Sequence, residues 1–110
     1  MNYEENVRRK IEAGNFAENN GRIIRAINVL AGKWVCLDTV KRALEDTIPA
    51  GELEKSMLFL LKAGYLQLRK KSCRQKAEWE DSIQEELEVT LTHNGMKLAM
   101  YYITDEAVRV

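Results

Sequence analysis

The feature that most constrains the fold is a predicted amphipathic helix that runs directly into a predicted strand. The helix spans about residues 50–63, and its apolar side is formed by Leu53, Met57, Leu60 and Leu61. Gly64 follows, and glycine is the residue that most often ends a helix in the left-handed conformation. Residues 65–69 then alternate apolar and polar side chains, as residues 87–91 do again. The two alternating segments predict a pair of antiparallel strands joined by a long polar connection.

Further helices are predicted before and after this unit. The Gly14-Asn15 pair is a typical helix stop, so the N-terminal part is expected to form two helices, one before residue 14 and one over residues 22–31 that Gly32 ends. Residues 34–36 read as a short extended piece. Asp38 is expected to cap a helix that ends near residue 45 and turns Val40, Ala43 and Leu44 inward.

Two positions mark where the remaining helices begin. Pro49 suits the start of the helix over residues 50–63, because its missing N–H would have no partner there. Thr92 is expected to cap a last helix that contains Leu98, Tyr102 and Ile103. We therefore divide the chain into an N-terminal helical arm over residues 1–20, a domain over residues 21–103 and a tail over residues 104–110.

Composition limits the compartment and the class of function. The chain has 110 residues, which suits one domain with an arm, and its 17 basic and 17 acidic residues give a formal net charge of zero. No run approaches the roughly 18 apolar residues that span a membrane, and the N-terminus does not resemble a secretory signal. We expect a cytoplasmic protein with no membrane partner, and zero charge excludes only a strongly basic nucleic-acid binder.

Few residues in the sequence support a catalytic or metal-binding function. The chain has two cysteines, Cys36 and Cys73, and one histidine, His93. These three residues are fewer than the four Cys or His ligands of a structural zinc site. We expect Cys36 in the core, Cys73 in a loop without a disulfide, and His93 facing solvent at a helix start. The acidic run lacks the spacing of a calcium loop; its members are Glu78, Glu80, Asp81, Glu85, Glu86 and Glu88. The sequence predicts no enzyme, no metal and no cofactor.

Two short sequence motifs resemble motifs of the winged helix-turn-helix superfamily. Leu60-Leu61-Lys62-Ala63-Gly64-Tyr65-Leu66 resembles the end of a recognition helix and the start of the wing in the MarR, ArsR and PadR types. Leu91-Thr92-His93-Asn94-Gly95 resembles the motif that follows the wing and begins the next helix in these families. The C-terminal segment from Leu91 to Val110 is also similar to small phage-encoded winged-helix proteins. The resemblance covers roughly residues 21–103. It implies a mainly α fold with a small antiparallel β-wing and flanking N- and C-terminal helices.

The resemblance also implies a DNA-binding transcriptional regulator that forms a homodimer. Residues 38–45 and 50–63 would be the helix-turn-helix pair, and residues 65–69 and 87–91 the wing strands. The basic residues expected on DNA are Lys41, Arg42, Lys55, Lys62, Arg69, Lys70, Lys71, Arg74 and Lys76. The residues expected at protein interfaces, including a dimer through residues 1–18 and 93–103, are Tyr3, Val7, Ile11, Phe59, Trp79, Leu98, Tyr102 and Ile103.

Several residues of the would-be reading helix favour a different function. Glu52 and Glu54 lie in its first turn and repel phosphate, while Leu58 and Phe59 are apolar where a DNA reader is usually polar. Phe59 either packs under the N-terminal helix or the wing, or forms a protein interface. The basic wing either contacts DNA or is neutralised by the acidic run across the hairpin. Trp79 is either a cover on the domain or an anchor for a partner. The alternative function is a protein-interaction module that does not bind DNA.

Overall fold

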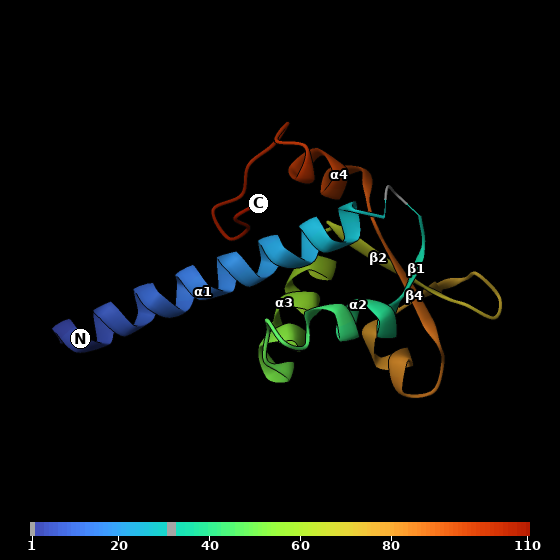
Figure 1. Ribbon diagram of the computed structural model, residues 1–110, viewed down its shortest axis with the longest axis horizontal. Helices are drawn as coiled ribbons and strands as arrows, with labels where there is room; N and C mark the ends of the chain where they lie inside the picture. The colour runs from blue at the N-terminus through green and yellow to red at the C-terminus, as the bar shows by residue number, and fades with distance from the viewer. Residues whose placement is uncertain (1, 31–32) are drawn as a thin grey trace.

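The computed structural model describes residues 2–30 and 33–110 and shows a small α+β fold. Over these residues the chain forms four α-helices, one short 3-10 helix and a four-stranded antiparallel sheet (Figure 1). The elements in chain order are α1 Tyr3–Asn28, β1 Val35–Cys36, α2 Leu37–Leu44, α3 Ala50–Lys62, β2 Leu66–Lys70, β3 Lys76–Ala77, η1 Trp79–Ile83, β4 Leu87–Leu91 and α4 His93–Ala99. No helix among them is both long and apolar enough to cross a membrane.

The sheet has the strand order β1-β4-β2-β3. Its centre is the antiparallel pair of β2 and β4, in which Leu66 faces Leu91 and Leu68 faces Val89. Both predicted strands are confirmed, β4 with the predicted bounds and β2 shifted by one residue. The long polar connection contains regular structure that the sequence did not predict, because β3 pairs with β2 as a hairpin and η1 follows it.

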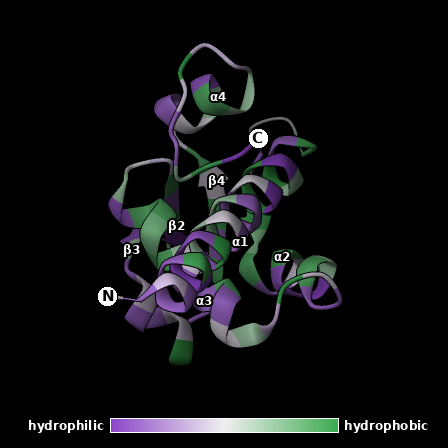
Figure 2. Cartoon of the chain, turned by 90° about the vertical axis from the view of Figure 1, so that its left-hand side faces the viewer, coloured by the Kyte–Doolittle hydropathy of each residue, from purple (hydrophilic) through white to green (hydrophobic). Residues whose placement is uncertain are grey.

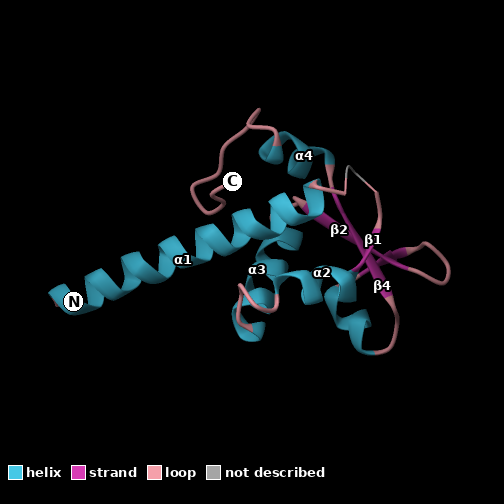
Figure 3. Cartoon of the chain, viewed as in Figure 1, coloured by secondary structure: helices cyan, strands magenta, loops and turns pink. Residues whose placement is uncertain are grey.

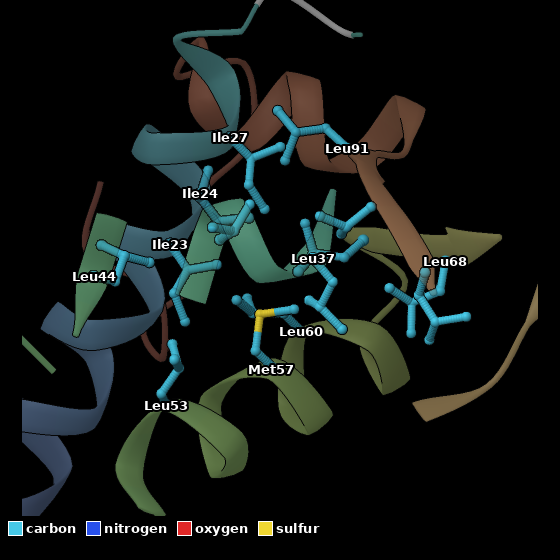
Figure 4. Close-up of a cluster of buried hydrophobic side chains, with 14 of the residues drawn as sticks. Ile23, Ile24, Ile27, Leu37, Leu44, Leu53, Met57, Leu60, Leu68 and Leu91 are labelled. Atoms are coloured by element: carbon cyan, nitrogen blue, oxygen red, sulfur yellow. The ribbon is translucent and has the colours of Figure 1, made fainter. Parts of the chain in front are cut away.

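The core lies between the sheet and the helices α1, α2 and α3, which gather on one side of the strands (Figure 3). The C-terminal half of α1 contributes Ile23, Ile24 and Ile27, which are completely buried, and α3 contributes Met57 and Leu60 (Figure 4). The period of the apolar residues explains this placement, since positions three and four apart lie on one face of a helix. The predicted inward face of α3 is confirmed, although Leu61 is only half-buried.

The N-terminal region forms one helix, so the predicted stop at Gly14 is wrong. α1 runs without a break from Tyr3 to Asn28, and the predicted arm boundary at residue 20 lies inside it. Glycine inside a helix costs only about 1 kcal/mol relative to alanine. The side-chain cap of Asn2 on the Glu5 amide and the burial of the second half of α1 outweigh this cost. The predicted end at Gly32 lies outside the described residues.

The start of α2 also differs from the sequence prediction. Cys36 occupies the cap position and Asp38 lies within the first turn, where its charge favours the positive end of the helix. Val40 and Leu44 are buried as expected, whereas Ala43 is exposed. Pro49 precedes α3 as its cap residue, and Gly64 takes the predicted left-handed conformation with φ +83°.

The last helix is shorter than predicted. Thr92 accepts a hydrogen bond from the Gly95 amide at 3.1 Å, as expected of a cap, but α4 ends at Ala99. Tyr101 has a positive φ of 66°, which is incompatible with a continuing right-handed helix. Tyr102 and Ile103 therefore lie beyond the helix.

The segment predicted as a tail, residues 104–110, lies along α1. Val108 is buried, the Arg109 amide donates to the Ala17 carbonyl at 2.9 Å, and the Asn20 side chain donates to the Ala107 carbonyl at 2.8 Å. A Cβ on Gly21 would come within 1.8 Å of the Arg109 carbonyl oxygen. The absence of a side chain at Gly21 therefore lets this segment approach the helix.

Candidate nucleic-acid interface

The β2–β3 hairpin carries the basic cluster found in the sequence. Its turn, residues 71–75, extends away from the helices at the far end of the sheet (Figure 1). Arg74 has a left-handed φ of 59°, and its amide donates to the Lys70 carbonyl at 2.7 Å. Lys71, Arg74 and Lys76 are exposed, and Lys70 is half-buried. The hairpin therefore gathers cations on a projecting element.

Two of the five cations are neutralised by carboxylates across from β2, one in β4 and one in the residue just before it. The Arg69 Nε lies 2.9 Å from the Glu88 Oε1, and its guanidinium also lies 4.2 Å from the Trp34 ring centroid. The Lys71 Nζ lies 3.5 Å from the Glu86 Oε1. For these two residues the prediction of cross-strand neutralisation is confirmed.

The other three cations of the hairpin have no such partner. Among residues 2–30 and 33–110, no carboxylate lies within ion-pair distance of Lys70, Arg74 or Lys76. A cation that has no ion-pair partner within its own chain can attract an external anion. We call these three residues the hairpin triad, and they are the cations of the hairpin that remain unpaired in the described chain.

The helix expected to read bases is partly covered by α1. Phe16 packs edge-on against Phe59 with ring centroids 5.1 Å apart, and the Lys55 Nζ lies 5.3 Å from the Phe16 ring. Figure 2 shows α1 running across α3. The interpretation of Phe59 as a packing residue under the N-terminal helix is confirmed, and its side chain is half-buried. Lys62 and Glu54 remain exposed.

Trp79 covers a cavity at the turn between α2 and α3. The Lys41 Nζ lies 5.0 Å from the Trp79 ring, which is half-buried and packs against the core. The cavity has a volume of about 290 Å³, and it is lined by Lys41, Glu45, Ile48, Ala50, Leu53, Glu54 and Trp79. Trp79 therefore acts as a cover on the domain, while Arg42 on the same helix α2 is exposed.

A thiol and a carboxylate meet near the start of the hairpin turn. The Cys36 thiol donates to the Glu86 Oε1 at 3.3 Å, and Cys36 is half-buried at the sheet edge rather than in the core. Burial and then this hydrogen bond raise the pKa of the Cys36 thiol. The same hydrogen bond, followed by Lys71, lowers the pKa of the Glu86 carboxyl. A thiol with a raised pKa stays protonated and is a poor nucleophile.

The other reactive residues lie apart from this pair. Cys73 is an exposed residue of the hairpin turn, and His93 is exposed at the start of α4, both as predicted. No group of three or more potential metal ligands occurs in the part of the chain that the structure describes.

The residues predicted at a dimer interface fall into two groups. Tyr3, Val7 and Ile11 are exposed on the first half of α1, and Tyr102 is exposed after α4. Leu98 is completely buried in the core of its own chain, so its assignment to an interface is wrong, and Ile103 packs partly against the same core. Leu98 points inward because α4 lies against α1 and β4, a contact that periodicity alone does not reveal.

Two aromatic residues make contacts whose partners the sequence did not specify. Trp34 stacks on Arg69 and Phe16 packs on Phe59. Both contacts join segments that are distant in the chain, so only strand register and helix packing bring them together.

Comparison with known proteins adds no further guide, since the chain matches no protein family, no curated protein and no solved structure.

Proposed function

We propose that this chain is a winged-helix protein that binds duplex DNA, chiefly through phosphate contacts of its β2–β3 hairpin. The order of elements supports the fold: α1, β1, α2 and α3 precede β2, the hairpin and β4, and β1 pairs with β4 beside β2. In such a fold α3 would be the recognition helix, and the hairpin would be the wing beside it.

The observation that carries the proposal is the hairpin triad. Arg74 lies in the projecting turn, and Lys70 and Lys76 flank it at the ends of β2 and β3. None of the three has an ion-pair partner in the described chain, whereas Arg69 and Lys71 are held by Glu88 and Glu86. Each lysine or arginine that neutralises a phosphate releases counterions, which makes binding favourable and dependent on salt. The triad is therefore the source of affinity in this proposal, and the two paired residues contribute less.

Base readout by α3 is expected to be weak. Its first turn contains Glu52, and Glu54 follows, so carboxylates would face phosphates where a recognition helix enters the groove. Lys55 lies over the Phe16 ring, and Lys62 is at the C-terminal end of the helix. Base edges are best recognised by Arg, Lys, Asn and Gln near the start of the helix. We therefore expect little sequence preference.

The test is the affinity for random duplex DNA measured by fluorescence anisotropy over a range of salt concentrations. Three phosphate contacts predict a slope of about −3 in a plot of log affinity against log salt. The triple variant Lys70→Gln/Arg74→Gln/Lys76→Gln should flatten this slope and lower the affinity at least about tenfold at low salt. An unchanged slope would refute the proposal.

A matched control removes three cations from other parts of the molecule. Arg9, Lys97 and Arg109 are exposed on the first half of α1, on α4 and near the C-terminus. The triple variant Arg9→Gln/Lys97→Gln/Arg109→Gln has the same net charge as the hairpin variant, so it should retain most of the affinity. Equal losses in both variants would mean that binding follows net charge and not the hairpin.

A second candidate function is a protein-interaction module, favoured by the cavity under Trp79. Its floor is apolar, through Ile48 and Leu53, and Glu45 and Glu54 line the same cavity. An apolar side chain next to a positive charge on a partner protein would complement it. This candidate predicts no DNA binding even at low salt, and a partner captured by the wild-type chain that the Trp79→Ala variant loses.

A further inference from the structure

The cavity under Trp79 combines an apolar floor with an aromatic wall. Ile48 and Leu53 are only 1% and 6% exposed, and the half-buried Trp79 side chain lines the cavity with them. The three residues come from the α2–α3 turn, from α3 and from η1, so the cavity lies where three segments meet. Its volume of about 290 Å³ is close to that of the smallest typical ligand pockets, roughly 300 Å³. A ligand in this cavity would bury one small apolar group.

Two carboxylates line the same cavity without an ion-pair partner. Glu45 ends α2 and Glu54 lies in α3, and both are exposed. Over residues 2–30 and 33–110, no lysine or arginine lies within ion-pair distance of either carboxylate. Further acidic residues adjoin the lining in the chain, since Asp46 follows Glu45 and Glu80 follows Trp79. A hollow bordered by charges of one sign concentrates ions of the opposite sign. The charge of the cavity therefore favours a positively charged occupant.

The contact between Lys41 and Trp79 shows that the aromatic wall can hold a cation. The Lys41 Nζ lies 5.0 Å from the centroid of the Trp79 ring, within the roughly 6 Å over which an aromatic face attracts an ammonium group. Lys41 forms no ion pair with Glu45 or Glu54, so it leaves both carboxylates unpaired. The lining thus has one ammonium group against two carboxylates, and a ligand with one positive charge would balance it.

We propose that this cavity binds a small organic cation, in which one apolar ring carries an ammonium or guanidinium group on a short chain. The ring would contact Ile48, Leu53 and Trp79, and the cation would face Glu45 and Glu54. A neutral ligand of the same shape lacks the attraction to the carboxylates, and an anionic ligand is repelled by them. The inference rests on neither proposed function, because it requires only the chain itself, without DNA or a partner protein.

Three probes of one shape and different charge test the proposal. Phenethylammonium, phenethyl alcohol and hydrocinnamate share a phenyl ring on a two-carbon chain and are positive, neutral and negative. Each is titrated into the isotope-labelled full chain, and the amide and indole resonances are followed by NMR. Phenethylammonium should bind with a dissociation constant of about 1 mM, as expected for a ligand of this size. Its binding should shift the resonances of Ile48, Leu53 and Trp79.

The two other probes measure the contribution of charge. Phenethyl alcohol should bind about threefold to tenfold more weakly than phenethylammonium, because exposed carboxylates contribute modestly to such a contact. Hydrocinnamate should bind more weakly still. Equal affinity of the three probes overturns the proposal, as do shifts confined to residues that do not line the cavity.

A double variant removes the carboxylates and keeps the shape of the cavity. Glu45→Gln/Glu54→Gln should weaken the binding of phenethylammonium about threefold to tenfold and leave that of phenethyl alcohol unchanged. The matched control is Glu4→Gln/Glu106→Gln, because these two exposed carboxylates do not line the cavity. It removes the same net charge and should change the affinity by less than about twofold, since salt screens distant charges. Equal losses in both variants would overturn the proposal.

Two further measurements test the aromatic wall and the kind of occupant. Trp79→Leu keeps an apolar side chain but removes the ring, so it should weaken phenethylammonium more than phenethyl alcohol. Equal effects on the two probes would overturn the role of the ring. A short arginine-containing peptide presents a similar cation on a peptide backbone. If this peptide binds at the cavity at least about tenfold more tightly than phenethylammonium, the occupant is a side chain of a partner protein and the proposal is overturned.

Discussion

At the scale of single residues, two glycines in one helix have opposite expected effects. A Cβ at Gly14 would meet nothing within 4 Å, whereas a Cβ at Gly21 would come within 1.8 Å of the Arg109 carbonyl oxygen. Gly14→Ala should raise the free energy of unfolding by up to about 1 kcal/mol through helix propensity. Gly21→Ala should lower it by about 1–3 kcal/mol, because the C-terminal segment must move. Urea denaturation of both variants measures the two effects, and equal shifts would contradict the close approach at Gly21.

Tyr65 provides a second prediction at this scale. Its hydroxyl donates to the Asp105 carboxylate at 2.5 Å, and burial, followed by this hydrogen bond, raises the Tyr65 pKa from 10 to about 12. The folded state holds the Tyr65 proton more tightly than the unfolded state does. The contribution of the Tyr65–Asp105 hydrogen bond to the free energy of unfolding is therefore complete below pH 10. It should be lost as the pH rises from about 10 to about 12.

The matched variant isolates that contribution. Tyr65→Phe removes the hydroxyl and should lower the free energy of unfolding by about 1–2 kcal/mol at neutral pH. It should also reduce the loss of stability of the wild-type chain between pH 10 and 12. Unfolding measured at several pH values checks both points, and identical pH dependence of the two proteins would show that the Tyr65–Asp105 bond does not contribute.

At the scale of elements, α1 consists of two halves with different stability. Residues 17–27 include seven buried positions, while residues 2–13 are all exposed. Hydrogen exchange followed by mass spectrometry should therefore show fast exchange in residues 2–13 and slow exchange in residues 17–27 in dilute solution. Uniform protection along α1 would contradict this division.

At the scale of the whole molecule, the C-terminal segment completes the core. Val108 is 4% exposed, and three hydrogen bonds join residues 107–109 to the Ala17 carbonyl and the side chains of Asn20 and Arg25. Removing residues 104–110 should lower the free energy of unfolding by about 2 kcal/mol or more. The loss combines the apolar surface that Val108 no longer covers with the broken hydrogen bonds, including that of Tyr65 to Asp105, and it is reduced by the regained chain entropy. Urea denaturation of the truncated chain measures this, and an unchanged midpoint would mean that the segment is dispensable.

The sequence by itself determined the local elements of this protein. The alternation of Leu87, Val89 and Leu91, the apolar face of α3, the left-handed Gly64 and the Thr92 cap all depend on neighbours close in the chain. Such interactions are visible in residue spacing, because strand and helix periods are fixed by backbone geometry. The cross-strand pairing of the basic and acidic runs was predictable for the same reason.

Only the tertiary structure decided which faces are covered. α1 passes Gly14 because its second half is held by the core, and Leu98 is buried because α4 packs on α1 and β4. Phe59 is covered by Phe16, and residues 104–110 return to α1. These contacts join segments far apart in the chain, and their free energy comes from burial rather than from local propensity. The tertiary structure also separated the paired cations Arg69 and Lys71 from the hairpin triad, on which the proposed function rests.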